Sequence, residues 1–452
     1  MPPWTVLIRR PLPASQTNGM LRRQRVVLWN SRRRVWRGSP WNARRSEMRV
    51  LYIDHYAGSP SAGMEYRPHA MATEWRRLGV ETVLLAGTFS HLRKVNFPDV
   101  RPGAPVDVDG VEFRFIRTRA YDGNGLGRVL SMIDFVSKGW VAARTIAREL
   151  RPDAVIASST YPFDTWMAQR IARCAGARLV HEIHDLWPLT PIELGGHSPR
   201  HPLMWAMARA ERSAYRRSNA IVSILPNAEP HVRSLGISTP VIPIPNGIES
   251  DGPHEPAPPS FAALVQEARA GGQSVIGYAG GFTNANAMDD FVEAMGLLRE
   301  EPITAVLLGD GIYRQQLEAR AQQLGARIVF AGTVRKPEVH ECLRLCDALY
   351  IGSKRSRLYE FGVSANKIFD YMATGVPIIN AFASDHSPLV YAGCAIRAEG
   401  EDPADIARAI REAAALPLEE RRQRGELAQE WVRSHHSMSV LARQFLDVLQ
   451  AG

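Results

Sequence analysis

The segment 364–379 holds the side chains of this chain that are best suited to bind a phosphorylated ligand. Its pattern predicts an N-cap at Ser364, a short helix and then a buried strand. Lys367 falls in the first turn of the helix, where the helix dipole disfavours a cation unless an anion binds beside it. Asp370 shares a helix face with Lys367 and can accept hydrogen bonds from sugar hydroxyls, with Asn366 next to them. The alternative is a solvated Lys–Asp pair without a ligand.

Glycine turns follow three of the predicted strands and could bring backbone N–H groups to one ligand. The residues concerned are Gly63, the pair Gly280 and Gly281 with the following Asn284, and Gly309. Open parallel sheets bind ligands at the carboxyl ends of their strands, which is where such turns lie. None of these turns has the G-x-G-x-x-G spacing, so a dinucleotide-dependent oxidoreductase is disfavoured.

Two ionisable residues, His184 and Asp185, directly follow a predicted buried strand over 179–183. An ionisable pair at the carboxyl end of a strand favours a functional site over a packed core histidine. Asp107 and Asp109 have the spacing of a two-aspartate metal motif. Because they lie at a predicted hairpin turn, we predict no metal site.

The net charge of +9 is concentrated in the first 47 residues. That segment holds 11 arginines and one acid, whereas the following 405 residues carry 44 basic and 45 acidic side chains. The folded part is therefore nearly neutral, and nucleic acid is not an expected partner. We expect translation to begin at Met48, with residues 1–47 disordered or not made. The alternative is an arm rich in Arg and Trp that binds nucleic acid or anionic lipid.

The length, the cysteines and the apolar runs of the chain indicate how many domains it has and in which compartment it folds. The 452 residues exceed one ordinary hydrophobic core, so two domains are expected. The four cysteines are scattered without a paired-thiol motif, as is usual in a reducing cytosol. No apolar run reaches the ~18 residues that a membrane-spanning helix needs.

From residue 48 onward, short apolar strands alternate with amphipathic helices, which predicts an α/β fold with parallel sheets. We expect two Rossmann-like domains that face a central cleft. The predicted parts are an N-terminal extension (1–47), a first, acceptor-side domain (48–247), a Pro-rich linker (248–272), a second, donor-binding domain (273–435), and a C-terminal helix (436–452) that is a candidate to cross back and pack on the first domain.

An ordered series of motifs resembles family 4 of the retaining glycosyltransferases, which have the GT-B fold. From residue 48 to the end, the matching segments are 184–188, 245–248, 277–281, 308–311, 330–332 and 366–377. Within that family the chain is most similar to a bacterial subgroup for capsule, O-antigen or other surface-polysaccharide assembly, in segments 63–67, 90–93, 123–128 and 191–196.

The resemblance implies that the second domain binds a nucleotide diphosphate sugar. Asp370 matches the second acid of the family's pair of glutamates, the one that holds the ribose. The first acid of the pair falls at Gly362, and Glu360 lies two residues away. Phe282 and Ala287 stand where the family has basic residues after the glycine loop.

Fewer cations are therefore left to neutralise the donor phosphates than the family usually has. On this resemblance, the phosphates would be bound by Lys367 and by helix and loop amides around Ser364 and Asn366. Lys354 or Arg355 are further candidates.

The resemblance implies a retaining, metal-independent sugar transfer to a hydroxyl acceptor. Lys367 would stabilise the leaving diphosphate, while His184 and Asp185 would orient the sugar or the acceptor hydroxyl. No separate cofactor is expected beyond the donor substrate. The enzymatic alternatives are a GT-B sugar-nucleotide epimerase or phosphorylase. The other alternative is a non-catalytic donor-binding or scaffolding homologue, suggested by the missing acid and basic pair.

The expected location is the cytoplasm, at the cytoplasmic face of the inner membrane if the acceptor is a lipid-linked saccharide. The segment 201–217 mixes Trp205 and other apolar side chains with Arg212, Arg216 and Arg217, which suits the surface of an anionic bilayer. The alternative is a helix packed in the first domain with its arginines in water.

Overall fold

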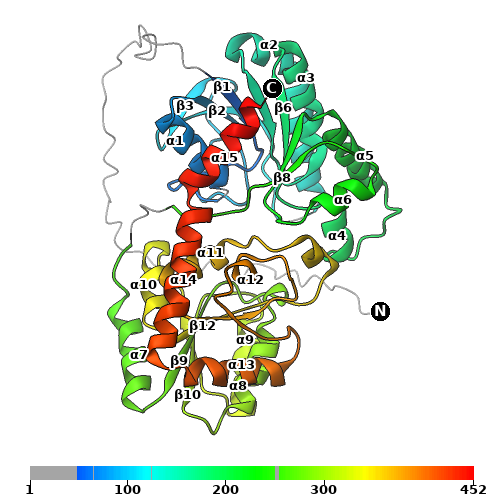
Figure 1. The fold of residues 1–452 in the computed structure, drawn as a ribbon. Coiled ribbons are helices and arrows are strands. Elements are labelled where there is room, and N and C mark those ends of the chain that lie inside the picture. Colours follow the sequence, from blue (N-terminus) through cyan, green and yellow to red (C-terminus); the bar gives the residue numbers. More distant parts are fainter. Residues whose placement is uncertain (1–47, 65, 124, 250–253, 452) are drawn as a thin grey trace, which may run out of the picture. The chain divides into compact units, whose positions relative to one another are not determined.

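A computed structural model describes residues 48–64, 66–123, 125–249 and 254–451 (Figure 1). The expectations for residues 1–47 concern a segment outside these ranges. The described part contains two parallel β-sheets that follow one another along the chain, each with helices packed on both faces. The α/β architecture with parallel sheets that the sequence predicts is confirmed.

The first sheet has eight strands in the order β3-β4-β2-β1-β5-β6-β7-β8, and only β3 and β4 pair in antiparallel fashion. Its strands are β1 (Arg49–Ile53), β2 (Glu81–Gly87), β3 (Pro105–Val108), β4 (Val111–Ile116), β5 (Ala154–Ala157), β6 (Arg178–Ile183), β7 (Ala220–Ser223) and β8 (Val241–Pro243). The helices among them are α1 (Arg67–Arg77), α2 (Leu126–Leu150), η1 (Pro162–Asp164), α3 (Thr165–Ala175), α4 (Leu189–Glu193), α5 (Pro202–Arg217) and α6 (Glu229–Ser234).

The second sheet has six parallel strands in the order β11-β10-β9-β12-β13-β14. Its strands are β9 (Ser274–Ala279), β10 (Ile303–Leu308), β11 (Ile328–Gly332), β12 (Ala348–Gly352), β13 (Ile378–Ala381) and β14 (Ile396–Arg397). The helices are α7 (Pro259–Ala270), η2 (Asn284–Asn286), α8 (Met288–Leu297), α9 (Arg314–Leu324), α10 (Lys336–Arg344), η3 (Arg357–Phe361), α11 (Asn366–Thr374), α12 (Pro388–Ala392), α13 (Pro403–Ala415), α14 (Leu418–His436) and α15 (Met438–Gln450).

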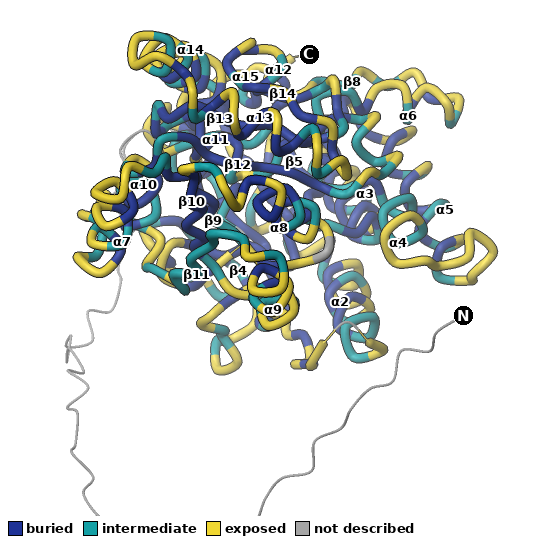
Figure 2. Tube along the Cα trace, turned by 90° about the horizontal axis from the view of Figure 1, so that it is seen from below, coloured by how far each residue is buried: buried dark blue, intermediate teal, exposed yellow. Residues whose placement is uncertain are grey.

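Both sheets consist of apolar strands that helices cover on both faces. All residues of β10, β12 and β13 are buried, as Figure 2 shows in dark blue for β10 and β12, because helices cover both faces of a parallel sheet. In each sheet the strand order reverses beside the first strand, β1 or β9. Loops at the carboxyl ends of these strands are therefore the places where ligands bind in such folds.

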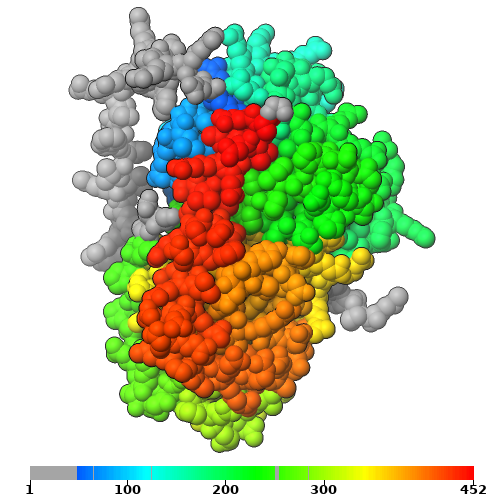
Figure 3. Space-filling view, viewed as in Figure 1, coloured from blue at the N-terminus to red at the C-terminus, as the bar shows by residue number. Residues whose placement is uncertain are grey.

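The C-terminal helices connect the two sheets. Helix α14 packs beside α11 of the second sheet, whereas α15 packs on α1 and β1 of the first (Figures 1 and 3). Phe445 lies against Trp75 and Tyr52, and Nε1–H of Trp75 donates a hydrogen bond to the carbonyl of Ala442 at 2.8 Å. The last helix of the chain thus completes the core of the first sheet.

The predicted Pro-rich linker over 248–272 was wrong for residues 259–270, which form α7. Pro259 occupies the first helical turn, where its missing N–H costs nothing. Phe261 and Val265 are buried against the second sheet. The prolines therefore mark a helix start, and the apolar residues behind them belong to a core.

Candidate functional site

Lys367 lies in the first turn of α11, and its Nζ donates a hydrogen bond to Oδ1 of Asn286 at 2.6 Å. The ammonium also lies 5.2 Å from the centre of the Tyr278 ring. Within the described ranges, no carboxylate lies at ion-pair distance from Lys367. Partial burial lowers the pKa of Lys367 to about 8. A partly buried cation with no acidic partner is costly unless an anion joins it, so this position suits a phosphate.

Lys354 lies beside the loop that carries Asn286, but two aspartates already neutralise its charge. Its Nζ pairs with Asp289 at 2.8 Å and with Asp290 at 2.6 Å, both at the start of α8. Its backbone N–H donates to the carbonyl of Ala285. Lys354 therefore holds the loop that carries Asn286, and its predicted contact with phosphate stays a prediction.

The glycine turns of the second sheet approach each other backbone to backbone. Gly309 has φ +140°, and a Cβ there would lie 1.9 Å from the carbonyl oxygen of Gly280. The N–H of Gly280 donates to Leu308, and the carbonyl of Gly281 accepts from Asn286. These glycines thus shape the loop next to Lys367. Asn284 belongs to η2, and its side chain lies outside what the structure describes.

Gly63 lies in the first domain, in the loop after β1. It has φ +106° and is buried, and a Cβ there would lie 2.7 Å from the backbone nitrogen of Lys94. Close packing of the loop against Arg93 and Lys94 therefore requires this glycine. Its predicted contact with a ligand remains a prediction.

The two polar residues that flank Lys367 on α11, Asn366 and Asp370, are both exposed. Ser364 is not the N-cap that the sequence predicts. Ala365 occupies that position, and the Oγ of Ser364 accepts a hydrogen bond from the backbone N–H of Asn246 at 2.8 Å. The serine therefore joins α11 to the end of the first domain instead of capping the helix.

No side chain fits at Gly362, where the family has the first acid of its pair. Gly362 has φ +96°, and a Cβ there would lie 2.6 Å from Cδ of Pro226 and 2.8 Å from the carbonyl oxygen of His386. Glu360 is exposed, and its carbonyl accepts a hydrogen bond from Nδ2 of Asn227 at 3.0 Å. Phe282 is fully buried in the core of the second domain.

His184 stands at the carboxyl end of β6, with 11 % of its side chain exposed. Its Nε2 lies 2.7 Å from Oγ of Ser158 and 3.3 Å from Oε2 of Glu182. The next residue, Asp185, accepts a hydrogen bond from Oγ1 of Thr190 at 3.0 Å, and burial raises its pKa. His184 is therefore held by Ser158, which directly follows β5, and by Glu182 of β6, and Asp185 fixes the turn into α4.

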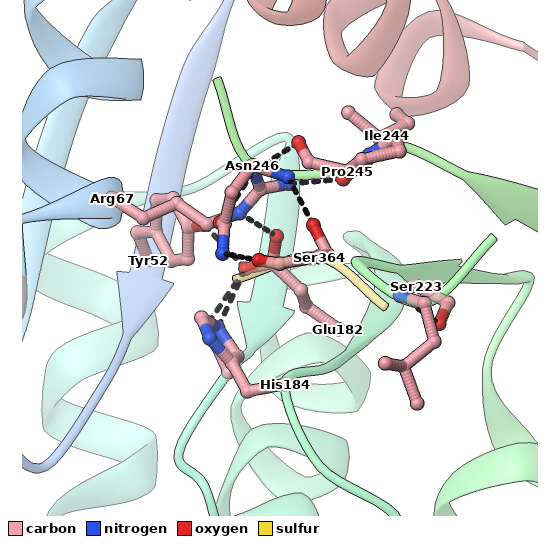
Figure 4. A network of polar contacts seen from close by, with 11 residues as sticks. Tyr52, Arg67, Glu182, His184, Ser223, Ile244, Pro245, Asn246 and Ser364 are labelled. Carbon is pink, nitrogen blue, oxygen red and sulfur yellow. Dashed lines mark hydrogen bonds and ion pairs between the residues drawn. The ribbon is translucent and has the colours of Figure 1, made fainter. Parts of the chain in front are cut away.

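Glu182 is the centre of a buried polar network (Figure 4). Its carboxylate accepts hydrogen bonds from the hydroxyls of Tyr52 and Ser158 and pairs with Nε of Arg67 at 2.9 Å. Burial alone would raise the pKa of Glu182, but Arg67, His184 and Ser158 hold it well below its usual range. The carboxylate thus stays ionised beside His184.

Arg67 extends this network to the crossover between the domains. Its guanidinium donates to the carbonyls of Ile244 and Pro245, each at 2.7 Å. Asn246 then contacts Ser364 twice, because its side-chain Nδ2 also donates to the Ser364 carbonyl at 2.9 Å. A chain of contacts therefore links His184 to the loop before α11, and so to the helix of Lys367.

Four residues of this arrangement were not predicted as site residues, namely Arg67, Ser158, Glu182 and Asn246. Of these, Arg67 and Asn246 lie in the matching segments 63–67 and 245–248. Glu182 carried a usable signal, because an acid inside an apolar parallel strand needs a buried partner. The identity of that partner, 115 positions away on α1, follows only from the fold.

Two known families match the chain. Residues 62–247 match the family described as glycosyl transferase 4-like domain, and residues 273–415 match glycosyl transferases group 1. The chain is a glycosyltransferase. Its reaction class is the transfer of a sugar from a nucleotide-sugar donor. The first matched range contains strands β2 to β8, and the second contains all six strands of the second sheet. The glycosyltransferase therefore carries His184 on its 4-like domain and Lys367 on its group 1 domain.

Solved structures share its fold over nearly its whole length. Sucrose-phosphate synthase from Thermosynechococcus elongatus is 15 % identical with a TM-score of 0.66, covering 89 % of this chain and 98 % of that one. HepE from Anabaena, solved with UDP and glucose, is 14 % identical with a TM-score of 0.60, covering 90 % and 100 %. A structure described as trehalose-6-phosphate from E. coli bound with UDP-2-fluoro glucose is 12 % identical with a TM-score of 0.65, covering 89 % and 99 %.

These similarities show the GT-B fold for the glycosyltransferase. A search of curated proteins found no match. Among the described residues, no helix has both the length and the apolar composition that crossing a bilayer requires.

Proposed function

We propose that this glycosyltransferase moves a hexosyl or N-acetylhexosaminyl group from a UDP-sugar to a hydroxyl acceptor, with retention at the anomeric carbon. The observation that carries the proposal is Lys367, a partly buried ammonium without an acidic partner among the described residues. HepE and the E. coli structure with UDP-2-fluoro glucose, which share the fold, are described with UDP or a UDP-sugar, which supports this donor class.

In the proposed reaction, the bond between the anomeric carbon and the β-phosphate oxygen breaks while the acceptor hydroxyl bonds to the same face of the sugar. The leaving UDP accepts the acceptor's proton on a β-phosphate oxygen. Lys367 and the N-terminus of α11 stabilise the negative charge that develops there. Asp370, which is exposed on the same helix, would accept hydrogen bonds from the ribose.

His184 and Asp185 would face the acceptor side and orient hydroxyl groups. The contact of His184 with Ser158 and Glu182 supports an orienting role, because these neighbours restrict the imidazole. The proposed acceptor is a lipid-linked saccharide of a bacterial surface polysaccharide, reached from the cytoplasmic side of the membrane.

One observation favours a second candidate, a donor-binding homologue that does not catalyse. Gly362 leaves no room for the first acid, and the buried Phe282 and Ala287 stand where basic residues are expected. A sugar-nucleotide epimerase is the remaining enzymatic alternative.

The experiment that separates these functions is a donor panel with the full chain. UDP release would be measured with several UDP-sugars, in the presence and absence of a bacterial lipid extract as acceptor. Acceptor-dependent UDP release that Lys367→Ala lowers by about a hundredfold supports the transferase. Calorimetric binding of a UDP-sugar without release under every condition supports the non-catalytic homologue. Acceptor-independent formation of an epimeric UDP-sugar, seen by chromatography, supports the epimerase.

A further inference from the structure

Helices α2, α3 and α5 lie side by side on one face of the first sheet (Figure 1). Arg170 of α3 lies over the ring of Trp140 of α2, 3.7 Å from its centre. Gln169 of α3 donates a hydrogen bond to the carbonyl of Ser213 on α5 at 3.1 Å. The outer sides of the three helices therefore form one continuous surface, which we call the tryptophan–arginine face.

Each of the three helices shows the same pattern on its outer side. A tryptophan is followed by arginines at intervals of three or four residues, which places them along one side of a helix. The sets are Trp140, Arg144 and Arg148 on α2; Trp166, Arg170 and Arg173 on α3; and Trp205, Arg209, Arg212 and Arg216 on α5.

The apolar members of this face are left in water. Trp205 is 62 % exposed and Val141 is 74 % exposed, and Trp140, Trp166 and Ile133 are also exposed. Inner residues such as Met204 and Met207 are buried. The helices thus present tryptophans outward although they already bury a complete apolar side against the sheet.

The charge on these helices departs strongly from that of the molecule. α2, α3 and α5 carry four, two and four basic residues, against two, none and one acidic residues. Of the acids, Glu211 is buried against His231, and Asp134 is paired with Arg119 and Lys138. Because the 405 residues from Met48 onward are close to neutral, this excess is local to the face.

The face also contains a place for a single anionic group. A surface depression of about 650 Å³ lies between the C-terminal ends of α2 and α3. Arg144, Arg148 and Arg151 line it together with Cys174 and Asp153. The carboxylate of Asp153 accepts a hydrogen bond from the backbone N–H of Arg49 at 2.7 Å, so it is engaged at the sheet.

We infer that the tryptophan–arginine face binds an anionic lipid bilayer, with a lipid phosphate in the arginine-lined depression. Tryptophans settle at the level of lipid headgroups, and basic residues near an anionic membrane surface are attracted to it. A nucleic acid would also attract the arginines, but it offers nothing to the exposed aliphatic residues Val141 and Ile133, which an interfacial region accommodates.

This inference rests on the proposed function only for the purpose of membrane binding. Binding to the bilayer would hold the enzyme where a lipid-linked acceptor lies. Helices on a parallel sheet begin at the carboxyl ends of the strands, where His184 lies. A bilayer along α2, α3 and α5 would therefore run beside the acceptor side of the site.

The first test compares two full-length variants with equal changes of charge. The face variant carries Arg148→Gln, Arg173→Gln and Arg212→Gln, one on each helix. The control variant carries Arg101→Gln, Arg433→Gln and Arg443→Gln, which are exposed and lie on other elements. Co-sedimentation would use vesicles of phosphatidylglycerol and phosphatidylcholine, and vesicles of phosphatidylcholine alone.

We expect the face variant to bind the anionic vesicles at least tenfold more weakly than the unchanged chain, and the control variant to bind within about twofold of it. Residues 1–47 are the same in all three proteins, so their contribution does not alter the comparison. Equal weakening in both variants, or tighter binding of the unchanged chain to single-stranded RNA than to vesicles, would overturn the inference.

A second measurement places the membrane contact directly. Cys174 is exposed, whereas the three other cysteines are buried, so a polarity-sensitive maleimide dye would label this position. Anionic vesicles should shift the emission of this dye to shorter wavelength, and phosphatidylcholine vesicles should not. A chain with Cys174→Ser and Arg443→Cys carries the control dye on α15. An identical shift at both positions, or none at Cys174, contradicts docking through this face.

UDP release from a UDP-sugar in the presence of a water-soluble acceptor, measured on the same proteins, separates this inference from the proposed function. Loss of vesicle binding with unchanged turnover in the face variant supports the inference and leaves the transferase intact. Vesicle binding by a chain that never releases UDP would instead contradict the transferase alone.

Discussion

Glu182 and His184 point to the same side of β6, and Oε2 of Glu182 lies 3.3 Å from Nε2 of His184. Residues two apart on a strand share a face, so a carboxylate at the first position can hold an imidazole at the second. The Oγ of Ser158 completes the contact, at 2.6 Å from the carboxylate and 2.7 Å from the imidazole. The same carboxylate pairs with Arg67, which contacts the crossover to the second domain.

Ser158→Ala should lower kcat by roughly tenfold, which corresponds to about 1.4 kcal/mol and to the loss of one well-placed hydrogen bond. The KM for the donor should change little, because Ser158 and His184 belong to the first domain, which we propose binds the acceptor. Steady-state kinetics with varied UDP-sugar checks this split. An unchanged kcat, or an effect confined to the donor KM, would contradict an orienting role of Ser158.

Lys367→Ala should lower turnover by about a hundredfold, as expected for the loss of a preorganised charge at a leaving group. The matched control is Lys354→Ala, which removes a lysine already paired with Asp289 and Asp290. It should affect turnover less than Lys367→Ala does. A larger loss in Lys354→Ala would assign the phosphate to Lys354 instead.

The charge of Lys367 should also appear in the pH dependence of the reaction. Because its pKa is lowered to about 8, the ammonium is protonated below that pH and neutral above it. The kcat/KM for the donor should therefore fall as the pH rises through about 8. Lys367→Arg should remove this alkaline limb, since a guanidinium stays charged. A limb that persists in Lys367→Arg would belong to another group.

Ser364→Ala should weaken the link between the domains, because Asn246 loses the acceptor of its backbone N–H. We expect a loss of about 1 kcal/mol in the free energy of unfolding and a higher KM for the donor. Ser434→Ala, on the exposed side of α14, is the control and should change neither value. Urea unfolding and donor kinetics measure both effects, and equal stability of the two variants would refute the link.

Excess EDTA should leave activity unchanged, because no group of three His, Cys, Asp or Glu side chains among the described residues could hold a metal ion. The measurement is UDP release before and after EDTA treatment. Loss of activity that added magnesium or manganese restores would contradict a metal-independent transfer.

Acid should destabilise the protein through two buried histidines. Burial lowers the pKa values of His181 and His436 to about 4, below the ordinary value near 6.5. Between these values the unfolded chain binds more protons, so stability should fall as the pH drops from about 6.5 to 4 and level off below. Urea unfolding across this range should show a smaller loss in His436→Gln. The exposed neighbour His435→Gln should behave like the unchanged chain.

The alternation of apolar strands and amphipathic helices was enough to predict both parallel sheets, because burial of strands on two faces leaves a local apolar pattern. The same is true of the short helix that carries Lys367, which ends before Gly375, a residue with φ +72°. Lys367 itself could be chosen from its place in a first turn, since the helix dipole acts within one turn.

The partners of these residues could not be predicted, because they come from distant parts of the chain. Ser364 has the composition of an N-cap, yet it bonds Asn246, 118 residues earlier. Lys354 resembles a phosphate-binding lysine, yet two aspartates of α8 neutralise it. The prolines near α7 suggested a linker, although Phe261 behind them is buried in the core.

The sequence by itself therefore determined the alternating elements, the strand-end loops and the types of residue that those loops carry. The tertiary structure decided which charges are matched and which are left for a ligand. Glu182 shows the reason. Its place in an apolar strand predicts a buried acid, but the stabilisation of its charge depends on Arg67, 115 positions away, and on Ser158, which follows the neighbouring strand β5. Electrostatic compensation is a property of contacts, and contacts between distant segments exist only in the folded chain.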